Sequence, residues 1–117
     1  MKSFHAHSVS IQHEDHVLSI GLADDAFDPI DFVILTRQDD PDSASTELLV
    51  NETDVEFFDA VTAVRFFDAQ IVLELDTALS DSLDYSSIHI ELDHDNDQLI
   101  IAIKRLFQGC NVSITLR

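Results

Sequence analysis

The segment SIHIELDHDNDQLIIAIKRLFQGCNVSITLR, residues 87–117, contributes most to the fold assignment. Apolar side chains alternate with polar ones over residues 88–92 and again over residues 112–116, which is the period of a strand with one buried face. Between these two runs, apolar residues recur at helical spacing from Leu99 to Phe107. The segment therefore predicts a strand, a helix and a second strand, with the helix packed across one face of a sheet.

The ends of this helix are also marked in the sequence. Asp95 is suited to cap the first turn, and Gln98, three residues later, completes a capping-box pattern. Lys104 and Arg105 place positive charge near the end, where it complements the helix dipole. Gly109 is placed to stop the helix. The principal helix is predicted over about residues 95–108.

Outside this segment the pattern is mostly that of strands. Clean alternation occurs over residues 18–22 and 71–75, and less regular strands are expected over residues 4–11, 31–36, 46–50 and 62–67. The alternation in the first of these slips near Ser8, which indicates a β-bulge. Hairpin turns are expected at residues 12–15 and at Asp68-Ala69, and a short helix capped by Asp76 or Thr77 is expected near residues 77–85.

These elements together predict an α+β fold. We expect a mainly antiparallel sheet of six to eight strands with one principal helix on one face. The length of 117 residues fits a single domain, residues 1–117. A hydrophobic content of 45% excludes a disordered chain despite the high charge. A single cysteine, Cys110, and the lack of a secretion signal or a long apolar run predict a cytoplasmic location.

Negative charge is the strongest compositional feature. Twenty-three acidic residues stand against six lysines and arginines, a formal net charge of -17. Residues 24–59 hold twelve of the acids and one basic residue, Arg37, so this segment alone carries a net charge of -11. Such charge disfavours nucleic acids and anionic membranes as partners and favours a basic protein.

Phenylalanines lie among these acids, which is the pattern of an interface with an aromatic anchor and a charged rim. Residues 54–59 fit it best, because an apolar pair is flanked by carboxylates. The residues predicted to contact the partner are Asp39, Asp40, Asp42, Glu52, Asp54, Glu56, Phe57, Phe58 and Asp59. The alternative is that the acids form a solvated surface and the phenylalanines belong to the core.

No motif in the sequence carries catalytic or metal chemistry. The stretch from Asp93 to Asp97 resembles the start of a calcium loop, but Gln98 and Lys104 stand where such a loop needs glycine and glutamate. The histidines of residues 13–16, and the pair His5 and His7, lack the spacing and the third ligand of a zinc pattern. Cys110 would need a histidine base such as His89 or His94. We expect no catalytic residue, no metal ligand, no cofactor and no enzymatic activity.

The layout from residue 32 to about residue 110 resembles a family of immunity proteins from bacterial polymorphic toxin systems, the tenth of the numbered immunity families. The similarity lies in the strands FVILTRQ (residues 32–38), TELLVNE (46–52), VTAVRFF (61–67) and QIVLEL (70–75), and in the closing strand, helix and glycine of residues 88–109. The resemblance implies a small cytosolic protein, without enzymatic activity or cofactor, that neutralises a cognate toxin by binding it. It directs attention to residues 51–59.

Two functions of different classes follow. The first is a binding protein that occludes a basic toxin. The second is a self-associating structural or regulatory α+β domain, for example a homodimer, whose acidity serves solubility. A small hydrolase using carboxylates or Cys110 is a third class that no motif supports.

Overall fold

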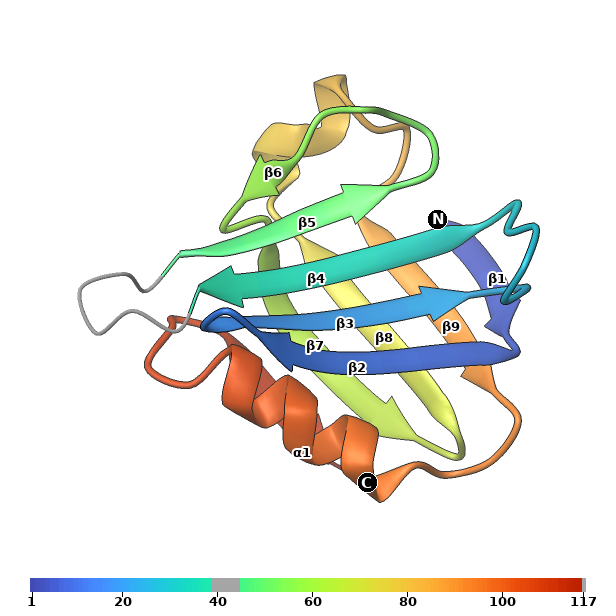
Figure 1. The fold of residues 1–117 in the computed structure, drawn as a ribbon. Helices are drawn as coiled ribbons and strands as arrows, with labels where there is room; N and C mark the ends of the chain where they lie inside the picture. Colours follow the sequence, from blue (N-terminus) through green and yellow to red (C-terminus); the bar gives the residue numbers. More distant parts are fainter. Residues whose placement is uncertain (39–44, 117) are drawn as a thin grey trace.

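The computed structural model describes residues 1–38 and 45–116, and it contains two five-stranded sheets and one α-helix in that part of the chain (Figure 1). Sheet A has the strand order β1 (Lys2–Ala6), β9 (Ser87–Leu92), β8 (Gln70–Leu75), β7 (Val61–Phe67) and β10 (Ser113–Leu116). Sheet B has the order β2 (Ser8–Glu14), β3 (Val17–Ala23), β4 (Phe32–Gln38), β5 (Thr46–Val50) and β6 (Phe57–Phe58). The strands of sheet B cross in front of those of sheet A, and helix α1 (Asp97–Leu106) lies across one end.

The α+β class is confirmed, but the strands form two sheets rather than one sheet of six to eight strands. Sheet B is an antiparallel meander. Sheet A is mixed, because β1 runs parallel to β9 and β10 runs parallel to β7. The two parallel pairings bring the N-terminal strand and the C-terminal strand to opposite edges of sheet A.

The slip in alternation near Ser8 marks a change of sheet, so the predicted bulge is wrong. Strand β1 ends at Ala6 in sheet A, His7 forms a bend, and β2 begins at Ser8 in sheet B. Phe4 and Ala6 point inward before the bend, and Val9 packs against the core after it. Two successive outward positions at the bend shift the phase of the alternation, and the chain uses this shift to cross between the sheets.

Helix α1 runs from Asp97 to Leu106 instead of about 95–108, and its N-cap lies one residue later than predicted. Its N-cap is Asn96, whose side chain accepts a hydrogen bond from the Leu99 amide at 3.0 Å. Asp95 instead accepts a hydrogen bond from the Ala69 amide at 2.9 Å and so ties the β7–β8 turn to the start of the helix. Gly109 has a φ of 77°, as expected after a helix end. The expected short helix is a 3₁₀ helix, Thr77–Asp81, capped by Asp76.

Both predicted hairpin turns are present. Asp15, the last residue of the first predicted range, and His16, which follows that range, join β2 to β3 with φ values of 51° and 64°, while residues 12–14 belong to β2. Asp68 and Ala69 join β7 to β8 with φ values of 47° and 58°. Two successive residues in the left-handed region match the right-handed twist of the flanking strands.

The inner faces of both sheets and one face of α1 form a common core. Aliphatic side chains such as Ile20 of sheet B and Leu73 of sheet A fill most of it. The buried residues of α1 are Leu99, Ala102, Ile103 and Leu106. Tight burial of these aliphatic side chains is the main stabilising contribution to the fold. In the described part of the chain, no helix has the length and apolar character that crossing a membrane requires.

Candidate protein-binding surface

The one basic residue of the acid-rich segment points into the molecule. The Arg37 guanidinium, on β4, donates hydrogen bonds to the carbonyl of Leu106 at 2.9 Å and to the carbonyl of Gln108. These carbonyls lie at the C-terminal end of α1, where positive charge is favourable. Because Arg37 is used at the helix end, its charge is directed away from the acids of β5 and β6.

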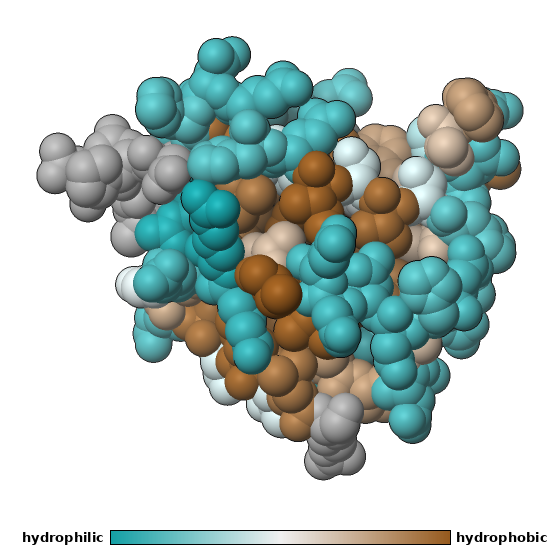
Figure 2. All heavy atoms as spheres, turned by 60° about the horizontal axis from the view of Figure 1, so that its bottom comes forward, coloured by the Kyte–Doolittle hydropathy of each residue, from teal (hydrophilic) through white to brown (hydrophobic). Residues whose placement is uncertain are grey.

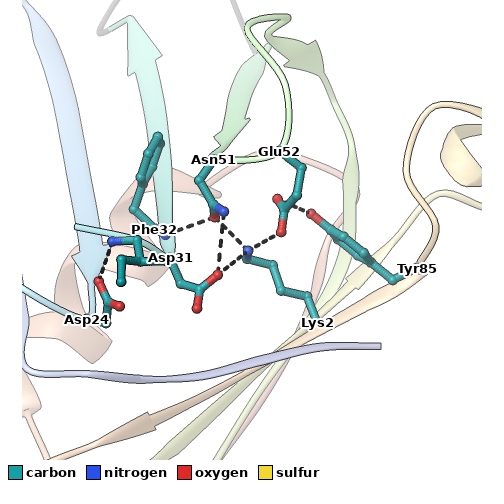
Figure 3. Close-up of polar contacts among 8 residues, drawn as sticks. Lys2, Asp24, Asp31, Phe32, Asn51, Glu52 and Tyr85 are labelled. Carbon is teal, nitrogen blue, oxygen red and sulfur yellow. Dashed lines mark hydrogen bonds and ion pairs between the residues drawn. The ribbon is translucent and has the colours of Figure 1, made fainter.

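Lys2 joins β1 to the loops at one end of sheet B (Figure 3). Its side chain is only 4% exposed, and its ammonium donates to Asp31 Oδ1 at 3.3 Å, to Asn51 Oδ1 at 2.6 Å and to Glu52 Oε1. Asn51 Oδ1 also accepts a hydrogen bond from the Phe32 amide at 3.0 Å. A buried charge needs such partners, and these partners hold the two sheets together at this end.

Glu52 therefore has a structural role. Its second carboxylate oxygen accepts a hydrogen bond from the Tyr85 hydroxyl at 2.9 Å. Burial alone would raise the pKa of Glu52, but the hydrogen bonds from Lys2 and Tyr85 outweigh it and hold that pKa below its ordinary value. Burial, reinforced by the neighbouring Glu52 carboxylate, raises the pKa of Tyr85.

The outer face of sheet B carries apolar side chains that do not contact the core. Ile34 on β4 pairs with Leu49 on β5, and Glu47, two residues before Leu49, pairs with Phe58 on β6. Phe58 is 64% exposed, and Val55, in the preceding loop, is 59% exposed. We define the β6 surface by seven residues that lie on this sheet face or in the segment that leads into β6: Ile34, Glu47, Leu49, Asp54, Val55, Glu56 and Phe58.

Two carboxyl groups of the β6 surface lie in contact with each other. A hydrogen bond with Glu56 is the main reason why the pKa of Glu47 is raised, and burial and the charge of Glu56 add to it. The Thr36 hydroxyl donates to Glu47 Oε2 at 3.5 Å. Among the described residues, no lysine or arginine forms an ion pair with Glu47, Asp54 or Glu56. The surface thus holds negative charge that the described part of the protein does not neutralise.

A second exposed aromatic lies on the loop between β3 and β4. Phe27 is 97% exposed, on a loop whose shape is fixed by two aspartates. Asp25 Oδ1 accepts hydrogen bonds from the Phe27 amide at 2.8 Å and the Asp28 amide at 3.3 Å, and these bonds lower the pKa of Asp25. Asp24 Oδ1 accepts from the Ile30 amide at 2.9 Å. The loop is thus held in one shape by its own carboxylates.

The predicted contact residues fall into three groups. Asp54, Glu56 and Phe58 lie on the β6 surface, with side chains exposed to solvent. Glu52, Phe57 and Asp59 make internal contacts: Phe57 packs against the core, and Asp59 Oδ1 accepts a hydrogen bond from the Thr46 amide at 3.1 Å. The remaining three, Asp39, Asp40 and Asp42, lie outside the described residues.

Sequence reasoning missed Ile34, Glu47 and Leu49 as members of this surface, and it included Val55 in the stretch 54–59 without naming it as a contact residue. Glu47 and Leu49 are the outward positions of β5, between the buried Thr46, Leu48 and Val50. That alternation is visible in the sequence, but the pairing that brings Phe58 beside Glu47 is not.

The structure also gives His5 and His7 the third neighbour that the sequence did not reveal. Asp93 Oδ1 lies 2.7 Å from His5 Nε2 and 2.9 Å from His7 Nδ1. The two imidazole rings stack, with centroids 4.2 Å apart and planes inclined by 24°. Hydrogen bonds from His5 and His7 hold the pKa of Asp93 below its ordinary value, although partial desolvation acts in the opposite direction.

A scan against models of known protein families found no match, and a search of the curated proteins found no match either. The resemblance to immunity proteins thus stays a prediction, and the residues of this chain support the functional proposal.

Proposed function

We propose that this protein is a non-enzymatic binding domain that captures a basic protein on the β6 surface and occludes it, as an immunity protein neutralises a toxin. The observation that carries the proposal is the exposed Phe58, which pairs across the strands with Glu47, whose carboxyl group interacts with that of Glu56. Protein–protein interfaces commonly have large apolar side chains at a well-packed centre and polar or charged residues around it.

The Glu47–Glu56 contact supports a cationic partner in particular. Two neighbouring carboxylates repel each other once both are ionised, and this repulsion contributes to the raised pKa of Glu47. A lysine or arginine placed between them would remove the repulsion and donate a hydrogen bond to each carboxylate. Nucleic acids and anionic membranes offer no such group and would be repelled by the net charge of -17.

The apolar strip on the outer face of sheet B supplies the area for contact. Ile34, Leu49 and Phe58 lie on adjacent strands of a rigid sheet, so little ordering is needed on binding. Phe58 is expected to act as the anchor, and the surrounding acids are expected to accelerate the encounter with the partner.

The proposal is tested with the product of the gene beside the one that encodes this protein. Isothermal titration calorimetry at low and high salt should show tight binding that weakens strongly with salt. Phe58→Ala should weaken binding by about 2 kcal/mol, roughly thirtyfold, and Glu56→Gln should reduce the salt dependence. Ile101→Ala is the matched control, since Ile101 is 65% exposed on α1.

Self-association is a second candidate that one observation favours. Figure 2 shows apolar side chains grouped at the end of the molecule where α1 lies, with hydrophilic residues around them. Leu116 on the edge strand β10 is 46% exposed, and with Phe66, Phe67 and Ile100 it lines a hollow of about 250 Å³. Light scattering separates the candidates: a stable dimer disrupted by Leu116→Lys, with Phe58→Ala silent, would favour self-association.

A further inference from the structure

We propose that His5, His7 and Asp93 form a binding site for a zinc-like divalent ion, with a fourth position open to water or another ligand. This site is separate from the β6 surface and does not depend on the proposed binding function. It combines two imidazoles from the N-terminal strand and its bend with a carboxylate that follows β9.

Strand register brings these three residues together. His5 faces outward on β1, between the buried Phe4 and Ala6, and the next outward position is His7. The parallel pairing of β1 with β9 sets His5 opposite Glu91 and Ala6 opposite Leu92. Asp93, the next residue after β9, therefore lies level with His7.

The distances suit a small ion. One candidate ligand atom from each of the three residues lies within 4.8 Å of the other two. Zinc binds nitrogen and oxygen ligands at about 2.0–2.2 Å, which sets tetrahedral ligand atoms about 3.3 Å apart. Asp93 Oδ1 lies 2.7 Å from His5 Nε2 and 2.9 Å from His7 Nδ1, so a small shift of the Asp93 side chain away from the two rings would admit the ion.

Surrounding groups complete the arrangement. With zinc on His5 Nε2, the proton of the neutral ring lies on Nδ1, whose distance of 3.6 Å from Glu91 Oε2 must shorten for Glu91 to accept a hydrogen bond from it. A carboxylate behind a ligating histidine orients the ring and strengthens it as a ligand. A hollow of about 140 Å³, lined in part by His7, Asp93 and His94, gives space for the fourth ligand.

The donor set selects the class of metal. Two imidazoles and one carboxylate suit Zn²⁺, Cu²⁺ or Ni²⁺, whereas Mg²⁺ and Ca²⁺ prefer oxygen ligands alone. The negative charge of the protein raises the local concentration of any cation. The many exposed carboxylates also bind cations weakly, so the test needs a background of Mg²⁺ to occupy them.

The experiment is calorimetric titration of the full chain with Zn²⁺ in millimolar Mg²⁺. One ion should bind per chain, and each of His5→Ala, His7→Ala and Asp93→Ala should weaken binding by more than about tenfold. Glu91→Gln should weaken it by about tenfold, as is typical for an outer-shell carboxylate. His16→Asn is the matched control, because His16 is an exposed histidine in the β2–β3 turn.

A second measurement protects the test against misfolding of a variant. Nuclear magnetic resonance of the wild-type protein with Zn²⁺ should shift the signals of the His5 and His7 rings and leave that of His16 unchanged. The proposal is overturned if the three variants bind Zn²⁺ as the wild type does, if the His16 signal shifts instead, or if Mg²⁺ abolishes binding.

Discussion

Lys2 makes contacts with residues that lie far along the chain. Its ammonium meets Asp31, Asn51 and Glu52, which lie 29 to 50 positions away. Nothing in the N-terminal sequence indicates this role, because an isolated lysine at residue 2 looks like an exposed terminal charge. The same limit applies to Asp93, whose position beside the histidines of β1 and its bend depends on a pairing between the first strand and the ninth.

Replacing Lys2 by methionine is expected to destabilise the protein by about 1–3 kcal/mol. The change removes hydrogen bonds to a charged group and leaves Asp31 and Glu52 without their cation. The loss stays below that of a fully buried ion pair, since both carboxylates retain some contact with water. Urea unfolding at neutral pH measures it. Lys104→Met, on the exposed surface of α1, should change stability by no more than about 0.5 kcal/mol.

The acid side of the stability profile should depend on Glu52. Its pKa is lowered from 4.5 in the folded protein, so the unfolded chain binds the proton more readily. The stabilising contribution is complete above pH 4.5 and is lost as the pH falls through the lowered pKa. In urea unfolding, the difference in the free energy of unfolding between the wild type and Glu52→Gln should become smaller as the pH is lowered. A gap that stays constant between about pH 6 and about pH 3 would contradict this account.

At the scale of elements, local patterns identified most strands, and the assignment of strands to sheets depended on distant contacts. Strand β5 has the predicted bounds, and β3, β8 and β9 cover the regions of clean alternation. The phase shift near Ser8 has the same local appearance for a bulge and for a crossing between sheets. A bulge and a crossing differ only in the pairing partners of the two halves: here β1 pairs with β9 in sheet A, and β2 pairs with β3 in sheet B. For this reason one sheet was predicted where there are two.

The β7–β8 turn gives a prediction for a single element. Ala69 has a φ of 58°, a conformation that is unfavourable for alanine and free for glycine. Ala69→Gly should therefore stabilise the protein by about 0.5–1 kcal/mol, measured by thermal or urea unfolding. Ala63→Gly is the control within β7, where glycine should destabilise by about as much. Equal destabilisation by both changes would show that the turn is not strained.

At the scale of the whole molecule, composition predicted the acidic character, but it did not predict which acidic residues stabilise the fold and which remain at the surface. The acid-rich segment includes Glu52 and Asp59, which stabilise the fold, and Arg37, which holds the end of α1. Residues 54–58 keep three of the predicted contact residues at the surface. The opposing pair of Glu47 and Glu56 could not be found without the β5–β6 pairing.

If the β6 surface binds a cationic group, removing the repulsion between Glu47 and Glu56 should stabilise the protein in the absence of its partner. Glu56→Gln is expected to add about 0.5 kcal/mol at neutral pH in low salt, the scale of an exposed charge pair. Since the pKa of Glu47 is raised from 4.5, the repulsion develops as the pH rises through that pKa, and the gain should vanish below pH 4.5. Thermal unfolding measures the effect, and Glu14→Gln is a control of equal net charge. Equal gains in both variants would indicate a general charge effect.

The most direct test of binding at the β6 surface is site-specific photo-crosslinking in the cells that produce the protein. A photoreactive phenylalanine analogue replaces Phe58 in one sample and Ile101 in another, both of which are exposed. Mass spectrometry then identifies the captured protein. We predict one strongly basic protein crosslinked from position 58, absent from position 101 and lost in cells carrying Glu56→Gln together with Glu47→Gln. Capture of a second copy of this chain, or the same proteins from both positions, would contradict the proposed function.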